Sequence, residues 1–101
     1  MKLLLSSAIF LALSSNVFAF TPQMKFFVNR EVATVQIMNN TNRVLVCSGV
    51  AYGTTMNRIT LNAWFNNVQV TPGAFANAYV YSNYYDPFIN VWANVNCQFS
   101  Y

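Results

Sequence analysis

The carboxyl-terminal residues 89–101 alternate between an apolar and a largely polar series without interruption. The apolar series is Ile89, Val91, Ala93, Val95, Cys97, Phe99 and Tyr101, and the other is Asn90, Trp92, Asn94, Asn96, Gln98 and Ser100. Only a β-strand has a side-chain period of two, so the pattern predicts a strand that buries its odd-numbered side chains, Cys97 included. The opposite face, rich in amides and carrying an indole, is unusual for a plain solvent face.

Residues 1–19 have the composition of a secretory signal peptide. Lys2 precedes an apolar run over residues 3–13, and Val17-Phe18-Ala19 supplies the expected cleavage site. A retained membrane helix is the alternative, but a helix over residues 3–13 rises only about 16 Å against a hydrocarbon core of roughly 30 Å. We expect cleavage after Ala19, one secreted or periplasmic domain over residues 20–101, and no stable membrane insertion afterwards.

Both cysteines, Cys47 and Cys97, lie in the part expected to be exported, where oxidation is favoured. A reactive thiol would need a nearby base or cation, and the chain has no histidine. We therefore expect a structural disulfide between Cys47 and Cys97. Closing a loop of about fifty residues stabilises a domain by about 4 kcal/mol in the chain-entropy model.

The rest of residues 20–101 has no sustained helical period. Short alternating runs are separated by segments rich in asparagine, glycine and proline, as is typical of all-β sandwiches and barrels. We predict strands over residues 32–38, 43–52, 59–66, 68–70, 74–82 and 89–101, with a further short strand within 25–29. Turns are predicted at 39–42, 53–55, 72–73 and 83–87, and a bend at 66–67. The run over 43–52 is apolar on both sides and should be a central strand.

Six or seven short strands bury their apolar faces most economically as two sheets packed face to face. The strand number and length, with the order Cys47, Trp64, Cys97, resemble the immunoglobulin-like sandwich. The chain departs from antibody-type domains because Val95 stands in place of the tyrosine-corner residue and Cys97 lies in the last strand. The resemblance implies a small antiparallel two-sheet sandwich and no family function. A membrane barrel fits less well, since eight strands of about 9–11 residues leave nothing for turns.

The chain lacks the usual side chains of catalysis and metal binding. It has no histidine, and we interpret its two acidic residues, Glu31 and Asp86, as solvated charges at opposite strand ends rather than as a glycosidase pair. Two carboxylates and two bonded cysteines make no recognisable metal-ligand set. The formal net charge of +3 is too thinly spread for a nucleic-acid surface. We expect no catalytic residue, no metal or other cofactor, and no nucleic-acid partner.

Two pentapeptides, at residues 62–66 and 90–94, place a tryptophan between two asparagines. In a strand each tryptophan shares a face with its flanking asparagines. If the strands lie in one sheet, the predicted ligand-binding residues are Trp64, Trp92, Asn62, Asn66, Asn90 and Asn94. Rings bordered by amides suit a sugar ring, and they equally suit a protein partner. The competing interpretation is that both indoles are packed under Tyr84-Tyr85 or under residues 20–27.

These patterns predict a small non-catalytic binding module that recognises a glycan or an extracytoplasmic envelope protein. A self-assembling subunit of a fibre or surface layer is the alternative, because a surface with so few charges is poorly protected against pairing between strand edges. A secreted hydrolase inhibitor that presents the 83–87 loop is a third hypothesis. We interpret the sequon Asn39-Asn40-Thr41 as a turn.

Overall fold

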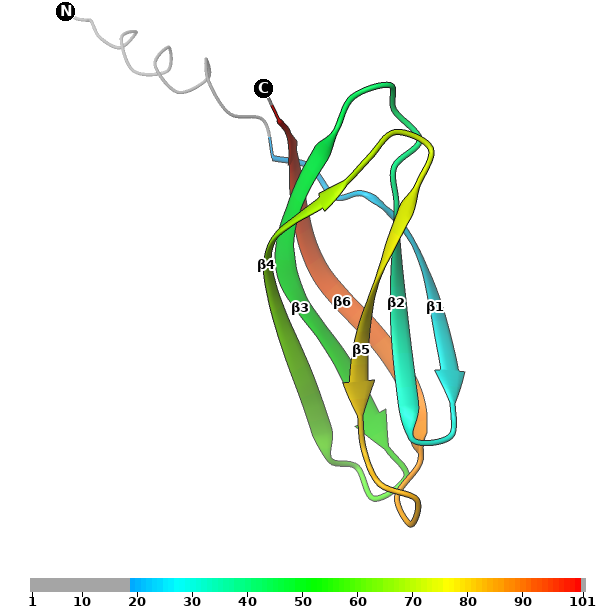
Figure 1. Ribbon diagram of the computed structural model, residues 1–101. Coiled ribbons are helices and arrows are strands. Elements are labelled where there is room, and N and C mark those ends of the chain that lie inside the picture. Colours follow the sequence, from blue (N-terminus) through cyan, green and yellow to red (C-terminus); the bar gives the residue numbers. More distant parts are fainter. Residues whose placement is uncertain (1–18, 101) are drawn as a thin grey trace, which may run out of the picture.

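In the computed structural model, residues 19–100 are described, so the signal peptide expected over residues 1–19 lies, apart from Ala19, outside the described residues, as does Tyr101. Residues 19–100 form six strands in two antiparallel sheets that pack face to face (Figure 1). The strands are β1 (Gln23–Asn29), β2 (Val32–Met38), β3 (Leu45–Thr55), β4 (Thr60–Val70), β5 (Phe75–Tyr81) and β6 (Phe88–Phe99). The first sheet has the order β1-β2-β5 and the second β4-β3-β6. The predicted all-β class is confirmed.

The core lies between the two sheets and is built from alternating strand residues. Ala33, Val35 and Ile37 of β2 are buried, as the alternation of residues 32–38 predicts. They belong to one apolar cluster with Leu45 of β3 and Val95 of β6. β3 is the middle strand of the second sheet, which confirms the central strand expected from its apolar residues on both faces.

Gly53 lies inside β3, so the turn predicted at residues 53–55 is wrong. A Cβ at this position would lie 2.4 Å from a ring carbon of Phe88. Phe88 is buried, and its ring occupies the space that a side chain on β3 would need. The glycine therefore permits a close approach between strands and does not reverse the chain.

The bend predicted at residues 66–67 is a β-bulge inside a single strand, β4. The register of the β3–β4 pair shifts between Cys47 and Gly49, so that Asn66 and Asn67 lie opposite Ser48. Asn67 adopts a left-handed φ of 54°. The Ser48 hydroxyl donates a 2.8 Å hydrogen bond to Asn66 Oδ1 and accepts one of 2.9 Å from the Asn67 amide. One short side chain thus holds the bulge in place.

A second register shift, between Thr54 and Thr55 of the β3–β6 pair, changes the start of the last strand. Ile89 is 61% exposed and the preceding Phe88 is buried, so the prediction that Ile89 points into the core is wrong. The irregularity moves one residue to the other face, because a one-residue slip reverses the alternation. Beyond it the odd-numbered side chains are buried or half-buried up to Phe99, as predicted.

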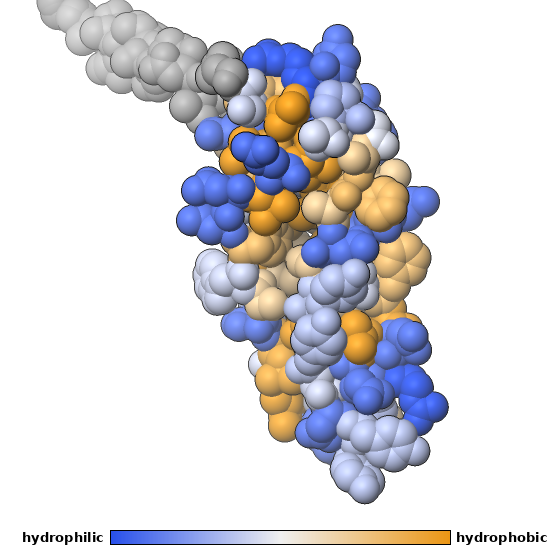
Figure 2. All heavy atoms as spheres, in the orientation of Figure 1, coloured by the Kyte–Doolittle hydropathy of each residue, from blue (hydrophilic) through white to orange (hydrophobic). Residues whose placement is uncertain are grey.

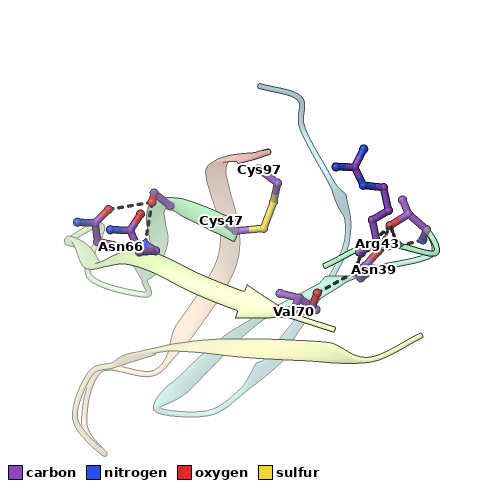
Figure 3. The surroundings of a disulfide bond; sticks show 9 residues. Asn39, Arg43, Cys47, Asn66, Val70 and Cys97 are labelled. Atoms are coloured by element: carbon purple, nitrogen blue, oxygen red, sulfur yellow. Dashed lines mark hydrogen bonds between the residues drawn. A yellow bond between two sulfur atoms is a disulfide. The ribbon is translucent and has the colours of Figure 1, made fainter. Parts of the chain in front are cut away.

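The expected disulfide is present and joins Cys47 of β3 to Cys97 of β6 (Figure 3). Both residues are buried and lie directly opposite each other, with their Cα atoms 4.0 Å apart. The bond therefore lies within one sheet. In antibody domains the disulfide connects the two sheets, so this bond differs from the one that the immunoglobulin-like resemblance would imply.

Asn39, fully buried, holds the loop between β2 and β3 at the same end of the sandwich. Its amide nitrogen donates to the carbonyls of Arg43 and Val70, each at 2.7 Å. Its Oδ1 accepts hydrogen bonds from the amide and hydroxyl of Thr41 at 2.9 and 2.6 Å. The loop predicted at residues 39–42 is organised by this side chain. Because the Asn39 side-chain nitrogen is buried and donates two hydrogen bonds, the sequon cannot carry a glycan in the folded protein.

Two further elements close this end. In the predicted turn at Pro72-Gly73, the Ala74 amide donates to the Thr71 carbonyl at 3.0 Å and Gly73 has a φ of 77°, as a type II turn requires. Phe20 exchanges backbone hydrogen bonds of 2.9 and 2.8 Å with Cys97 on the free edge of β6. The chain then crosses to the first sheet, where β1 begins.

The opposite end consists of three turns joined by backbone hydrogen bonds. The bonds run from the Ser82 amide to the Glu31 carbonyl, from the Phe88 amide to the Arg30 carbonyl and from the Met56 amide to the Pro87 carbonyl, at 2.8–2.9 Å. Asp86 is buried among these turns, and its Oδ1 accepts a 3.0 Å hydrogen bond from the Asn57 amide. Glu31 and Asp86 therefore lie at the same end of the sandwich, and the prediction that Asp86 is a solvated charge is wrong. The Asp86 carboxylate holds a turn.

Candidate binding surface on the second sheet

The outer face of the second sheet carries most of the residues selected from the sequence. Because β3 lies between β4 and β6, its register determines which side chains are neighbours. The cross-strand rows are Asn62–Tyr52–Trp92 and, next to it, Trp64–Val50–Asn94. The condition that both tryptophan strands lie in one sheet is met, and the two indoles lie on one face in adjacent rows.

The two indoles are exposed to different degrees. The Trp64 side chain is 75% exposed and that of Trp92 39%. Tyr84 and Tyr85, which were expected to cover them if they were packed, are themselves exposed at the end of the sandwich. Neither tryptophan is therefore part of the buried core, and the competing interpretation of the indoles is wrong.

Tyr52 is a member of this surface that the sequence did not identify. Its ring stacks on the Trp92 indole, with centroids 5.1 Å apart and planes inclined by 16°. The stack occupies one face of Trp92 and leaves Trp64 as the more accessible ring. Tyr52 could be found only with the strand order, because it belongs to neither tryptophan strand.

A shallow hollow of about 540 Å³ adjoins Trp64. It is lined by Ser48, Gly49, Trp64, Phe65, Asn66 and Asn96. Its volume falls within the range of roughly 300–1,000 Å³ that is usual for small-molecule sites. The bulge creates this polar lining, because the Ser48 hydroxyl fixes the Asn66 amide (Figure 3). Asn96 joins the lining from the polar side of β6, although the sequence did not select it.

Asn90 lies at the far end of the face, opposite Thr54. Its Oδ1 accepts a 2.9 Å hydrogen bond from the amide of Val91, so that oxygen is used within its own strand. The structure thus brings Asn62, Trp64, Trp92 and Asn94 together in two rows, places Asn66 at the hollow and leaves Asn90 at the margin.

The candidate surface is uncharged, since β3, β4 and β6 contain no Asp, Glu, Lys or Arg. Within residues 19–100 no three His, Cys, Asp or Glu side chains are grouped so that they could hold a metal ion. The same part of the chain has no helix long and apolar enough to cross a membrane. The surface offers ring stacking and neutral hydrogen bonds.

The 83–87 loop, which the inhibitor hypothesis invokes, is a tight turn at the end of the molecule. Asn83 Oδ1 accepts a 3.0 Å hydrogen bond from the Tyr85 amide, and the Tyr85 side chain is 88% exposed. The Arg30 guanidinium lies 5.2 Å from the centre of the Tyr84 ring. Whether this loop inhibits a hydrolase stays a prediction.

Comparison with known proteins gives no relative. No family model, no curated protein and no solved structure matches the chain. What the surface binds is therefore inferred from its geometry and chemistry alone.

Proposed function

We propose that this protein is an exported, non-catalytic binding module that recognises a glycan on the outer face of its second sheet. The observation that carries the proposal is the 75% exposed indole of Trp64 beside an amide-lined hollow. A large aromatic ring left in water is unfavourable, and exposed tryptophan is enriched at binding surfaces. The expected signal peptide and the buried disulfide support export, because such bonds persist in oxidising compartments.

The chemistry of the surface suits an uncharged sugar. The flat face of Trp64 would stack against the C–H face of a sugar ring, with Asn66, Asn96 and the Ser48 hydroxyl able to bond to ring hydroxyls. The row that contains Tyr52 and Trp92 would contact a second ring of the same chain. An envelope protein is the alternative partner. A structural subunit of a fibre or surface layer is the second candidate function, favoured by uncharged strand edges.

The test is to compare Trp64→Ala with Tyr81→Ala on a glycan array and then by calorimetry with the best ligand. Tyr81 is a matched control because its exposed ring lies on the outer face of the first sheet. We expect Trp64→Ala to weaken binding at least tenfold, about 1.4 kcal/mol, while its melting temperature stays close to that of the wild type. Tyr81→Ala should bind normally.

Three results would overturn the glycan proposal. Equal binding by wild type and Trp64→Ala would place the ligand elsewhere. A large fall in melting temperature for Trp64→Ala would show that the indole is structural. If the protein bound no glycan on the array and captured an envelope protein in a Trp64-dependent way, the surface would be assigned to a protein partner.

A further inference from the structure

The sandwich has two open sides, each formed by one edge strand from each sheet. β4 and β5 lie next to each other on one side, and β1 and β6 on the other. In every edge strand alternate backbone amides and carbonyls point away from the sheet, where they have no strand partner. Within residues 19–100, β6 has two exceptions: the outward groups of Cys97 pair with Phe20, and the Phe88 amide donates to the Arg30 carbonyl. The pairing with Phe20 is an isolated bridge, and it shows that a backbone segment can bond to the β6 edge.

The edges lack the usual protection against pairing with another chain. Edge strands commonly carry charges or proline for this purpose. β4, β5 and β6 contain neither, and β1 contains one charge, Lys25. Lys25 lies opposite Gln36 on the outer face of the first sheet, so its charge does not point between the sheets. A bulge at Asn66 and Asn67 interrupts β4 near one end and leaves its first half regular.

The β4/β5 side contains an apolar hollow of about 140 Å³. Three alanines, Ala63, Ala76 and Ala78, line it, and it reaches the buried side chain of Ile37. Figure 2 shows apolar side chains gathered between the positions that β4 and β5 occupy in Figure 1. An apolar cavity of roughly 150 Å³ is large enough to hold benzene. The hollow therefore has the size of a phenyl ring.

The β1/β6 side presents apolar side chains of matching size. Phe26 lies opposite Val35 and Val28 opposite Ala33, and both partners are buried. Directly opposed residues point to the same face of a sheet, so Phe26 and Val28 point inward. They are nevertheless 44% and 41% exposed, because β1 is an edge strand at an open side. One side of the molecule thus presents a phenyl ring and the other a hollow that fits one.

We propose that copies of this chain associate head to tail, the β1/β6 side of one against the β4/β5 side of the next. Phe26 of one copy would enter the hollow beside Ala63 and Ala78 of its neighbour. β1 and β5 are both antiparallel to β2, and β4 and β6 are both antiparallel to β3. A copy displaced sideways without rotation would therefore bring both pairs of edges together in parallel orientation.

This contact uses a different patch on each copy, so each bound copy leaves one open side free. Such a heterologous interface that does not close generates a filament. The first sheet would continue through the filament, and the second would continue along the part of β6 that Phe20 leaves open. The outer face with Trp64 and Trp92 would recur on every copy. The inference does not depend on glycan binding, because Phe26 and the alanines of the hollow are not among the residues proposed to contact the glycan.

The first test is sedimentation and electron microscopy of the disulfide-bonded domain over rising concentration. Wild type should form filaments, and Phe26→Asp should remain monomeric because a carboxylate cannot enter the apolar hollow. Phe27→Asp is the matched control: Phe27 is the adjacent residue, 48% exposed, on the outer face of β1. Phe27→Asp should assemble as the wild type does.

The hollow is tested from the other side with Ala78→Leu, which fills it, and with Tyr81→Leu, which changes an exposed outer-face side chain of the same strand outside the hollow. Ala78→Leu should be monomeric and Tyr81→Leu should assemble. Trp64 borders both hollows, so no variant of it is used here. Unchanged melting temperature of each variant confirms that it is folded.

Mixing the two monomeric variants gives the decisive result. Phe26→Asp keeps an intact hollow and Ala78→Leu keeps an intact Phe26, so the mixture should form dimers of one copy of each. A wild type that stays monomeric at millimolar concentration would overturn the inference. The inference would also be overturned if the wild type formed dimers that Phe26→Asp abolished and Ala78→Leu left unaffected. Such dimers would be symmetric, with the same side of each copy in the contact.

Discussion

The two ends of the sandwich are held by different kinds of interaction. At one end a covalent bond joins β3 to β6, and the buried amide of Asn39 makes four hydrogen bonds. At the other end three turns are joined mainly by backbone hydrogen bonds, with one contribution from the Asp86 carboxylate. Backbone groups are present in any sequence, whereas the first end depends on a few particular side chains. Substitutions at the disulfide end should therefore lower the free energy of unfolding more than substitutions at the turn end.

The largest effect should come from the double variant Cys47→Ala with Cys97→Ala. The disulfide closes a loop with a sequence separation of 50 residues, and its loss should lower the free energy of unfolding by about 4 kcal/mol. Small domains are stable by only about 5–15 kcal/mol in total. Urea denaturation measures the loss, with reduced wild type as the control. A reduced wild type with an unchanged midpoint would contradict the comparison.

An intermediate effect should come from Asn39→Ala. The substitution leaves the carbonyls of Arg43 and Val70 without this donor, and a buried polar group that loses its partner costs about 1–3 kcal/mol. We expect a loss of about 3 kcal/mol in urea denaturation. Asn40→Ala is the control, because Asn40 is exposed and its side-chain amide bonds to the exposed side chain of Gln23. Equal losses for the two variants would show that the buried amide is not what holds the loop.

The smallest of the three effects should come from Asp86→Ala at the other end. The Asn57 amide loses its acceptor, and the backbone hydrogen bonds between the turns remain. We expect a loss of about 1.5 kcal/mol, and Asp86→Asn should recover most of it because it keeps an oxygen acceptor. A loss for Asp86→Ala greater than that for Asn39→Ala would reverse the comparison between the two ends.

The alternation of side chains was sufficient to predict several elements. It gave the bounds and the buried face of β2, because seven residues in strict alternation have one way to bury Val35 and Ile37 together. It also placed Trp64 and Trp92 on the outer face. The disulfide followed from two cysteines in a chain expected to be exported.

The errors arose where contacts between distant residues decide the local structure. Residues 53–55 have the composition of a turn. Gly53 is instead required inside a strand, because the ring of Phe88, far along the chain, occupies the space of a side chain. Ile89 continues a perfect pattern in the sequence, but a register shift against β3 turns its side chain outward. Tyr52 joins the candidate surface only because β3 is the middle strand, and strand order cannot be read from periodicity.

The disulfide also determines how the domain responds to a break in its chain. Tyr85, which is 88% exposed at the turn end, lies between the two cysteines in sequence. A protease that cuts there would produce two fragments that stay covalently joined, with β3 and β6 still aligned by their shared bond. In denaturing gel electrophoresis, nicked and intact protein would then migrate together until a reductant separates the fragments.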